Sequence, residues 1–301
     1  MADEKALDPD ALAGDAHVGN ENPLTKKLAA RQLAFLSAID VIIARLDRLL
    51  STASGQERAL ATVDYVASTL HHLCASAPWA SFQARLAVLT RLKGRATQLS
   101  TLPSLKSRFK ALATLVSETR YTLRLFELIP LWVWGSETLK HPPSDPIIHA
   151  LTILQIISNV VYQFLENVTY LASKGVISKR YINKYGGHDK LEIWSNRGWF
   201  GHVFLQFFVL WREHVLRKQR LAKRAAAGDI DIKSIETEET ALRVEIRSWR
   251  KRLLNNIIWT PLCFHWCFEE GVGIPSSFSG PISFMAGAWT LSDMWAATAN
   301  A

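Results

Sequence analysis

The stretch between Asp64 and Glu118 contains no Asp or Glu, and it constrains the fold more than any other part of the sequence. Its seven basic residues are set among apolar residues at helical spacing: Arg85, Arg91, Lys93, Arg95, Lys106, Arg108 and Lys110. A basic helical stretch with an apolar stripe suits the charged surface of a membrane better than a solvated protein face. We therefore expect helices in this region to lie against a membrane.

The distribution of charge supports the same expectation. The formal net charge is +8, but residues 1–22 carry six acids against one Lys and sum to −5, so the rest of the chain is +13. Such a balance favours anionic lipid or nucleic acid as partner. The basic residues are interleaved with aliphatic residues rather than with the aromatic residues on which nucleotide bases stack. We expect an anionic phospholipid membrane as partner and no nucleic acid.

Tryptophan is abundant in the C-terminal two thirds of the chain. Ten of the eleven Trp residues lie between Trp132 and Trp295. Trp concentrates at membrane interfaces, where an apolar ring and one N–H suit the headgroup level. The alternative is a Trp-rich soluble core, in which each indole N–H needs a buried partner.

The apolar periodicity is helical throughout, and no segment shows the alternation of a strand. We predict an all-α, integral or peripheral membrane protein, with amphipathic N-terminal helices and apolar C-terminal helices. Residues 1–23 are expected to be a disordered acidic tail. Residues 24–130 are expected to form an amphipathic helical region, and residues 131–301 a membrane-associated helical region.

The clearest amphipathic helix is predicted over 105–128, after Pro103. The residues expected to insert into a membrane share one face of this helix: Leu105, Phe109, Leu112, Val116, Leu123 and Phe126. Those expected to bind headgroups flank that face or precede it: Arg91, Arg95, Lys106, Lys110 and Arg124. A soluble bundle helix with its basic residues in solvent has the same pattern, because amphipathicity does not distinguish lipid from protein.

Three features describe the C-terminal region. Residues 147–165 contain no charged residue and are nearly long enough to cross a bilayer, although a buried core helix has the same pattern. Residues 199–211 are intensely apolar but short, which suits a re-entrant or in-plane segment or the start of a longer helix. Residues 212–252 are charged, with a turn near Asp229, and are predicted to form a helical hairpin outside the bilayer.

No pattern of catalytic or metal-binding residues emerges. Cys263, His265 and Cys267 include metal-ligand types, but on a helix His265 points away from the two cysteines. No nucleophile stands beside a base, and no pair of carboxylates occupies an apolar segment. We predict a protein that is not an enzyme and has no cofactor, no metal and no catalytic residues.

The sequence resembles the peroxisomal membrane peroxin 11 family (peroxisomal biogenesis factor 11) over about residues 28–297. The resemblance rests on 55–65 (GQERALATVDY), on 117–126 (SETRYTLRLF) through Pro130, and on 259–266 (WTPLCFHW) followed by 269–271 (EEG). Glu166, the sequence YLA at 170–172 and GVI at 175–177 fit between them. The family-motif residues are Arg120, Pro130, Glu166, Trp259, Pro261, His265, Trp266 and Gly271. The acidic tail and the charged hairpin are typical of a divergent, fungal-type member.

This resemblance implies a mostly helical protein of the peroxisomal membrane with its N-terminal helices on the cytosolic face. It implies elongation of the organelle before fission by insertion of amphipathic helices. It also implies self-association, and action together with a fission adaptor and a dynamin-like GTPase.

Two other functions remain open. Some family members are thought to conduct small metabolites, and Gln155, Asn159 and Gln163 are candidates for the polar lining of such a pore. The third possibility is a soluble helical scaffold protein, in which 147–165 is a core helix.

Overall fold

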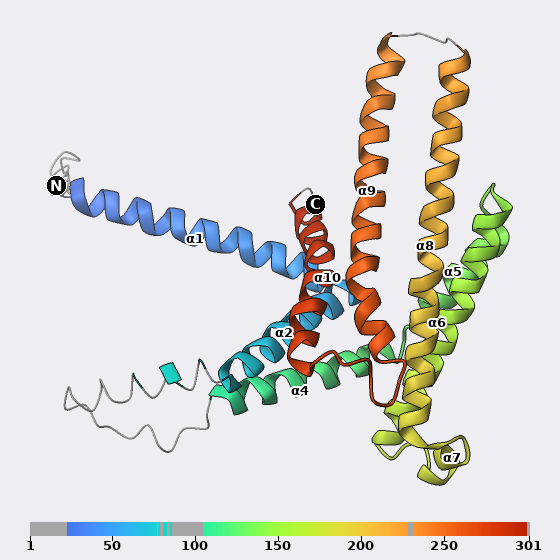
Figure 1. Cartoon of the computed structure of the whole chain (residues 1–301). Coiled ribbons are helices and arrows are strands. Elements are labelled where there is room, and N and C mark those ends of the chain that lie inside the picture. The colour runs from blue at the N-terminus through green and yellow to red at the C-terminus, as the bar shows by residue number, and fades with distance from the viewer. Residues whose placement is uncertain are drawn as a thin grey trace, which may run out of the picture. The chain divides into compact units, whose positions relative to one another are not determined.

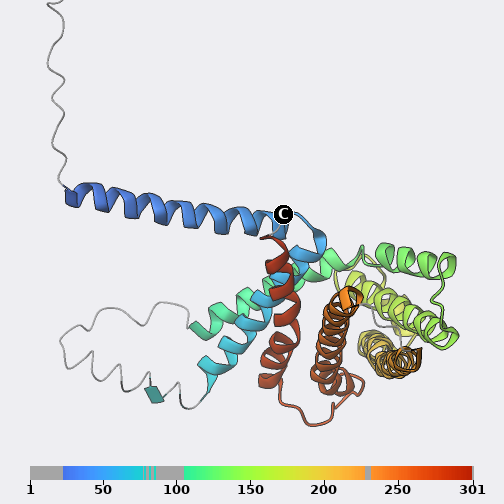
Figure 2. The same cartoon turned by 90° about the horizontal axis from the view of Figure 1, so that it is seen from above.

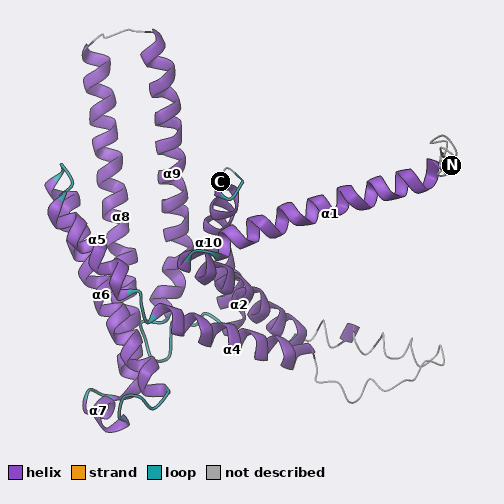
Figure 3. Cartoon of the chain, turned by 180° about the vertical axis from the view of Figure 1, so that it is seen from behind, coloured by secondary structure: helices purple, strands orange, loops and turns teal. Residues whose placement is uncertain are grey.

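The computed structural model describes residues 23–76, 78, 81–82, 85, 105–227 and 232–299. Within these ranges the chain forms helices and loops and no strand, so the predicted all-α fold is confirmed (Figure 3). The helices are α1 (Pro23–Leu50), α2 (Ala53–Ala75), α4 (Leu105–Arg124), α5 (Leu128–Lys140), α6 (Pro146–Ser173), α7 (Lys179–Lys184), α8 (Gly187–Ala227), α9 (Ile232–His265) and α10 (Ser276–Ala297). The predicted acidic tail over 1–23 and the headgroup residues Arg91 and Arg95 lie almost wholly outside the described residues.

The chain divides into two units, Met1–Arg48 and Leu49–Ala301. Most of α1 belongs to the first unit. It is a single 28-residue helix, and its apolar side chains are solvent-exposed, among them Phe35, Ile42 and Leu46. The remaining helices belong to the second unit.

Side-chain caps fix where two of the helices begin. Thr52 precedes α2, and its hydroxyl oxygen accepts a hydrogen bond from the Gly55 N–H at 3.1 Å. Asp145 precedes α6, and its carboxylate accepts from the Ile148 N–H at 3.0 Å. Pro146 takes the first helical position, where its missing N–H is not needed. These caps satisfy N–H groups that have no partner within the helix.

The second unit contains two groups of packed helices. In one group α2 packs against α4 and α10, and in the other α6 packs against α5 and α8, and α8 against α9 (Figures 1 and 2). The contacts of α9 with α10 and of α4 with α6 join the groups. The largest fully buried side chains are Gln163 of α6, Leu210 of α8, Leu262 and Cys263 of α9, and Ser283 of α10. The bulkiest part of the core therefore lies among the C-terminal helices.

Glycines allow the closest helix contacts in each group. A Cβ at Gly198 of α8 would lie 3.0 Å from the Ser158 carbonyl oxygen of α6. A Cβ at Gly280 of α10 would lie 3.0 Å from the Tyr65 carbonyl oxygen of α2. Both contacts are with backbone atoms, so a side chain at either position would push the two helices apart.

The two longest helices, α8 and α9, run side by side (Figure 1). Residues 199–211 lie in the middle of α8, so the segment belongs to a longer helix as one of the predictions had it, but this helix already begins at Gly187. Ion pairs join the charged parts of the two helices, Arg220 to Glu245 at 2.8 Å and Arg224 to Glu238 at 2.6 Å. Beyond 252 α9 continues to His265 with Pro261 in its interior, because the apolar residues there pack against α8 and α10.

Candidate functional site: an apolar band and an arginine network

The outward faces of α5 and α6 are apolar and uncovered. Trp132 on α5 is 79 % exposed. We call the exposed apolar residues of this surface the apolar band: Phe126, Ile129, Trp132, Val133, Leu139, Ile147, Leu154, Ile157, Val160, Val161 and Phe164. Large apolar side chains exposed together on neighbouring helices are a feature of membrane and protein interaction sites. The band is therefore a candidate interaction surface.

Helix α6 is a candidate membrane-spanning helix. Among the described residues it is the one helix that is long and apolar enough to cross a membrane, judged by length and composition. Its 28 residues extend about 42 Å, more than the roughly 30 Å of a hydrocarbon core. Only 11 % of its most apolar window is buried in the structure, whereas the core helix of a soluble protein is mostly buried.

The polar residues of α6 face the other way and are paired within the chain. Gln155 donates from Nε2 to Oε1 of Gln206 on α8 at 2.7 Å. The Nδ2 of Asn159 lies 2.8 Å from Nδ1 of His202. Gln163 donates to the Arg124 carbonyl oxygen at 2.9 Å. The residues considered for the lining of a pore thus join α6 to α8 and α4.

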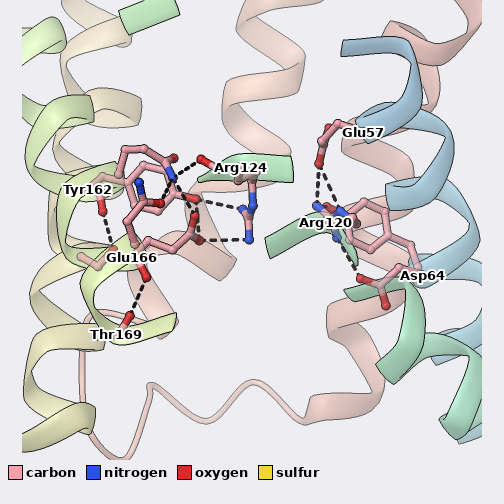
Figure 4. Close-up of polar contacts among 11 residues, drawn as sticks. Glu57, Asp64, Arg120, Arg124, Tyr162, Glu166 and Thr169 are labelled. Atoms are coloured by element: carbon pink, nitrogen blue, oxygen red, sulfur yellow. Dashed lines mark hydrogen bonds and ion pairs between the residues drawn. The ribbon is translucent and has the colours of Figure 1, made fainter. Parts of the chain in front are cut away.

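Arg120 joins α4 to α2. Its guanidinium donates to Glu57 at 3.0 Å, to Asp64 at 2.8 Å and to the Tyr65 hydroxyl at 3.3 Å (Figure 4). The Arg120 side chain is only 11 % exposed. Burial raises the pKa of Asp64 above its ordinary value, although Arg120 acts in the opposite direction. One arginine thus holds two half-buried carboxylates that lie seven residues apart on α2.

Arg124, one turn further along α4, joins this helix to α6. Its guanidinium pairs with Glu166 at 3.0 Å and donates to the Tyr162 hydroxyl at 3.0 Å. It also lies 4.7 Å from the centroid of the Tyr121 ring. In Figure 4 the Arg120 and Arg124 side chains leave α4 toward different neighbours. We call these contacts of Arg120 and Arg124 the arginine network.

A polar cavity of about 530 Å³ adjoins the arginine network, lined by residues of α2, α4, α6, α8, α9 and α10. Part of its wall is aromatic. The Trp199 ring lies 5.0 Å from Trp259 and 5.9 Å from Trp266, and Trp259 lies 6.5 Å from Tyr65, measured between centroids. Glu127, in the turn between α4 and α5, also lines the cavity. Burial raises the pKa of Glu127 to about 6, with Glu57 and Glu166 adding to the rise and Arg124 opposing it.

The predicted membrane-inserting face of α4 is divided in the structure. Phe109, Val116 and Leu123 share the face of Arg120, which is directed toward α2, and Val116 is buried. Leu112 and Phe126 are exposed, as is Leu115. The first residue of α4 is Leu105.

The predicted headgroup residues also differ in their surroundings. Lys106 and Lys110 are exposed on α4, beside the equally exposed Arg108. Arg124 instead is engaged by Glu166 and Tyr162, which removes its charge from the outer surface in this structure. The lipid contacts of Lys106 and Lys110 remain predictions.

Most residues of the family motif lie in or near the site. Arg120 and Glu166 belong to the arginine network, and Trp259 and Trp266 to the aromatic wall of the cavity. Pro130 is exposed in the first turn of α5, and Pro261 lies inside α9. His265 ends α9, and its Nδ1 accepts from the Val272 N–H at 2.8 Å. Gly271 has φ +64°, and its hydrogen faces the His265 ring, so a side chain there would be strained and would displace that ring.

Sequence reasoning did not predict the acidic partners of the two arginines. Glu57 and Asp64 lie seven residues apart, on one face of a helix, and both pair with Arg120, whereas Arg124 pairs with Glu166 of α6. The two acids on one helix face were the sequence signal for the α2–α4 pair. No sequence signal placed Trp199 beside Trp259 and Trp266, because these contacts depend on how α8 and α9 cross.

Over the residues that the structure describes, the fold is all-α and one helix is suited by length and composition to crossing a membrane. Residues 89–262 match the family model described as Peroxisomal biogenesis factor 11 (PEX11), and this match covers more than half of the chain. The chain therefore belongs to the peroxisomal biogenesis factor 11 family, which has a role in peroxisome biogenesis and proliferation and is not a known enzyme family. Comparison with curated proteins and with solved structures gives no match.

The matched segment is shorter than the resemblance read from the sequence. It contains Arg120, Pro130, Glu166, Trp259 and Pro261. His265, Trp266 and Gly271 follow it, and the helix that carries Glu57 and Asp64 precedes it.

Proposed function

We propose that this protein resides in the peroxisomal membrane, and that it remodels and elongates this membrane by inserting an amphipathic helix, which promotes peroxisome proliferation and fission. Membership of the family supports the role in biogenesis. The observation that supports the membrane part is the apolar band along α5 and α6, which none of the described residues covers.

In this proposal α6 anchors the protein. Its outward side chains contact lipid, while its polar side chains are paired with α8 and α4. The cost of placing amides in a membrane falls when each has a partner inside the protein. The exposed Trp132 of α5 suits the interface between hydrocarbon and headgroups.

In the same proposal α4 is the wedge. Its exposed cations Lys106, Arg108 and Lys110 attract anionic headgroups, at about 1 kcal/mol for each basic residue near the surface. Leu112 and Leu115 already face outward, whereas Val116 is covered in the α2–α4 pair. Full insertion therefore requires α4 to leave α2, and insertion into one leaflet expands that leaflet and bends the membrane.

The proposed partners rest on family membership alone. They are further copies of this protein, a fission adaptor and a dynamin-like GTPase. Self-association would concentrate the wedges on one patch of membrane. Conduction of metabolites is not part of the proposal, because Gln155, Asn159 and Gln163 have partners inside the chain.

The test uses the full chain reconstituted with anionic liposomes at low salt. We expect the protein to resist carbonate extraction and to convert vesicles into tubules. The double variant Leu112→Glu/Leu115→Glu should lower tubulation at least tenfold. The control Thr114→Glu/Thr119→Glu adds the same charge to exposed positions of α4 and should retain most of the activity. Release by carbonate, or equal loss in both double variants, would contradict the proposal.

A further inference from the structure

The polar cavity beside the arginine network has the size of a ligand site. Its volume of about 530 Å³ lies within the range of roughly 300–1,000 Å³ that is usual for small-molecule sites. Its lining also includes several charged residues, which are costly to bury without partners. The pairing of these charges therefore indicates what the cavity can hold.

Most of the lining charges are satisfied. Arg120 neutralises the pair formed by Glu57 and Asp64, and Arg124 pairs with Glu166. Glu192, at the exposed edge, lies 3.6 Å from Nδ1 of His188. These groups need no ligand.

Two lining groups of opposite charge have no partner among the described residues. Arg58 forms no ion pair there, and its buried Nε makes no hydrogen bond. The Glu127 carboxylate accepts no hydrogen bond and forms no ion pair within the same part of the chain. Arg58 and Glu127 are not paired with each other either. An unpaired cation and an unpaired carboxylate in one cavity are complementary to a molecule that carries both charges.

The aromatic wall adds a preference for the cationic part of such a molecule. Trp199, Trp259 and Trp266 pack against one another at this wall. Indole faces attract ammonium groups, and sets of them recognise quaternary ammonium ligands. Arg58 lies at the α10 side of the cavity, where its Nη1 is 3.9 Å from the Cβ position of Gly287.

The cavity lies next to the apolar band in the chain. Phe126 and Ile129 belong to the band and flank Glu127, and Phe164 precedes Glu166 on α6. Charged groups that follow directly on a lipid-facing apolar surface lie at the level of the headgroups. A phospholipid is therefore a nearby source of a molecule with both charges.

We propose that this cavity binds a zwitterionic phosphate–ammonium ligand, with the phosphate on Arg58 and the ammonium group between Glu127 and the Trp199–Trp259–Trp266 wall. The headgroup of a choline phospholipid is the source that the structure favours, and free phosphocholine shares its chemistry. The site exists while α4 is packed on α2, before any insertion, so ligand binding is measured separately from the wedge.

The test is calorimetric titration of the full-length protein in a neutral detergent with phosphocholine, and with a short-chain phosphatidylcholine below its micellar concentration. We expect both to bind. Arg58→Gln and Glu127→Gln should each weaken binding at least tenfold, because each removes one of the two unpaired charges. The controls Arg247→Gln and Glu270→Gln alter exposed residues away from the cavity and should stay within twofold.

Two further measurements test the phosphate and ammonium subsites one at a time and identify the source of the ligand. Arg58→Gln should abolish binding of inorganic phosphate alone, whereas Glu127→Gln should abolish binding of choline alone. If phosphatidylcholine binds more tightly than phosphocholine, the lipid is the source; if only phosphocholine binds, the lipid assignment is wrong.

If Arg58→Gln fails to fold by circular dichroism, Arg58→Lys, which keeps the charge, should bind with intermediate affinity. Absence of binding by either probe to the folded wild type, or unchanged binding by both cavity variants, would overturn the site.

Discussion

Helices α4 and α6 are both amphipathic, but the structure covers opposite faces of them. The polar face of α6 is covered by α8 and α4, and its apolar face is open. In α4 the apolar residue Val116 is covered in the pair with α2, and the basic residues Lys106 and Lys110 are open. Hydrophobic periodicity describes both helices alike. The partners of each face therefore support different proposed roles, α6 as the lipid-facing anchor and α4 as a wedge that must first leave α2.

The largest expected effect comes from the contact that joins the two helices. Arg124→Ala leaves Glu166 buried without its partner and should cost about 3–5 kcal/mol of unfolding free energy. Chemical denaturation in detergent measures it. Lys110→Ala is the control, and as an exposed substitution it should change the free energy by less than about 0.5 kcal/mol. The double variant Arg124→Met/Glu166→Leu should recover most of the loss, and equal losses in the double and single variants would contradict a role for the ion pair.

The second effect tests whether α2 restrains α4. Arg120→Ala removes the contacts to Glu57 and Asp64 and should lower stability by about 2–3 kcal/mol. Because it frees the covered face of α4, the same variant should bind and tubulate anionic vesicles several-fold more strongly. A variant that is less stable but tubulates no better would show that α4 acts without leaving α2.

The third effect separates lipid-facing from protein-facing positions. Ile157→Asp places a charge on the exposed face of α6, at a cost of about 2.5–3.5 kcal/mol for a helix centre in a membrane. We expect more protein to be released by carbonate, with an unchanged circular dichroism spectrum in detergent. The comparison variant is Thr152→Asp, which places the same charge at a half-buried position near the start of α6. Unchanged membrane retention of Ile157→Asp would remove α6 as the anchor.

The smallest effect is a pH dependence. The pKa of Glu127 is raised from 4.5 to about 6 in the folded protein, because burial disfavours its charge and Glu57 and Glu166 repel it, against Arg120 and Arg124. Folding therefore favours the protonated form of Glu127. The folding stability that this form contributes is fully present below pH 4.5 and is lost as the pH rises through about 6. Glu127→Gln should add about 1 kcal/mol of stability at pH 7.5 and little at pH 4.5, after allowance for partial solvent exposure. Equal effects at both pH values would contradict this assignment.

Much of the fold could be predicted from the sequence because its signals are local. Apolar periodicity predicted the helical class, and the charge-free stretch 147–165 predicted an apolar helix where α6 lies. The charged residues from 212 onward do form paired helices, but α8 and α9 extend well beyond the predicted hairpin. No Pro or Gly signal stops α8 at Trp211, and the interior Pro261 does not end α9.

The site was harder to predict because its contacts join distant residues. Arg124 looked like a headgroup ligand because it lies beside the basic flank of α4, and only the packing of α6 shows its pair with Glu166. Val116 and Leu112 looked equivalent by spacing, yet α2 covers one side of α4 and leaves the other open. Arg120 and Glu166 were found through the family motif, whereas Glu57, Asp64 and Glu127 were not assigned a role.

Quenching of a fluorescent label by brominated lipids in proteoliposomes tests the contrast between α6 and α4 most directly. The label is placed at Ile157→Cys on α6 or at Val116→Cys on α4, after Cys74, Cys263 and Cys267 have been replaced. The account predicts strong quenching at position 157 in every background. At position 116 it predicts little quenching in the otherwise native protein and strong quenching when Arg120→Ala is added. Absence of quenching at position 157 would contradict the central claim that the open face of α6 lies in lipid.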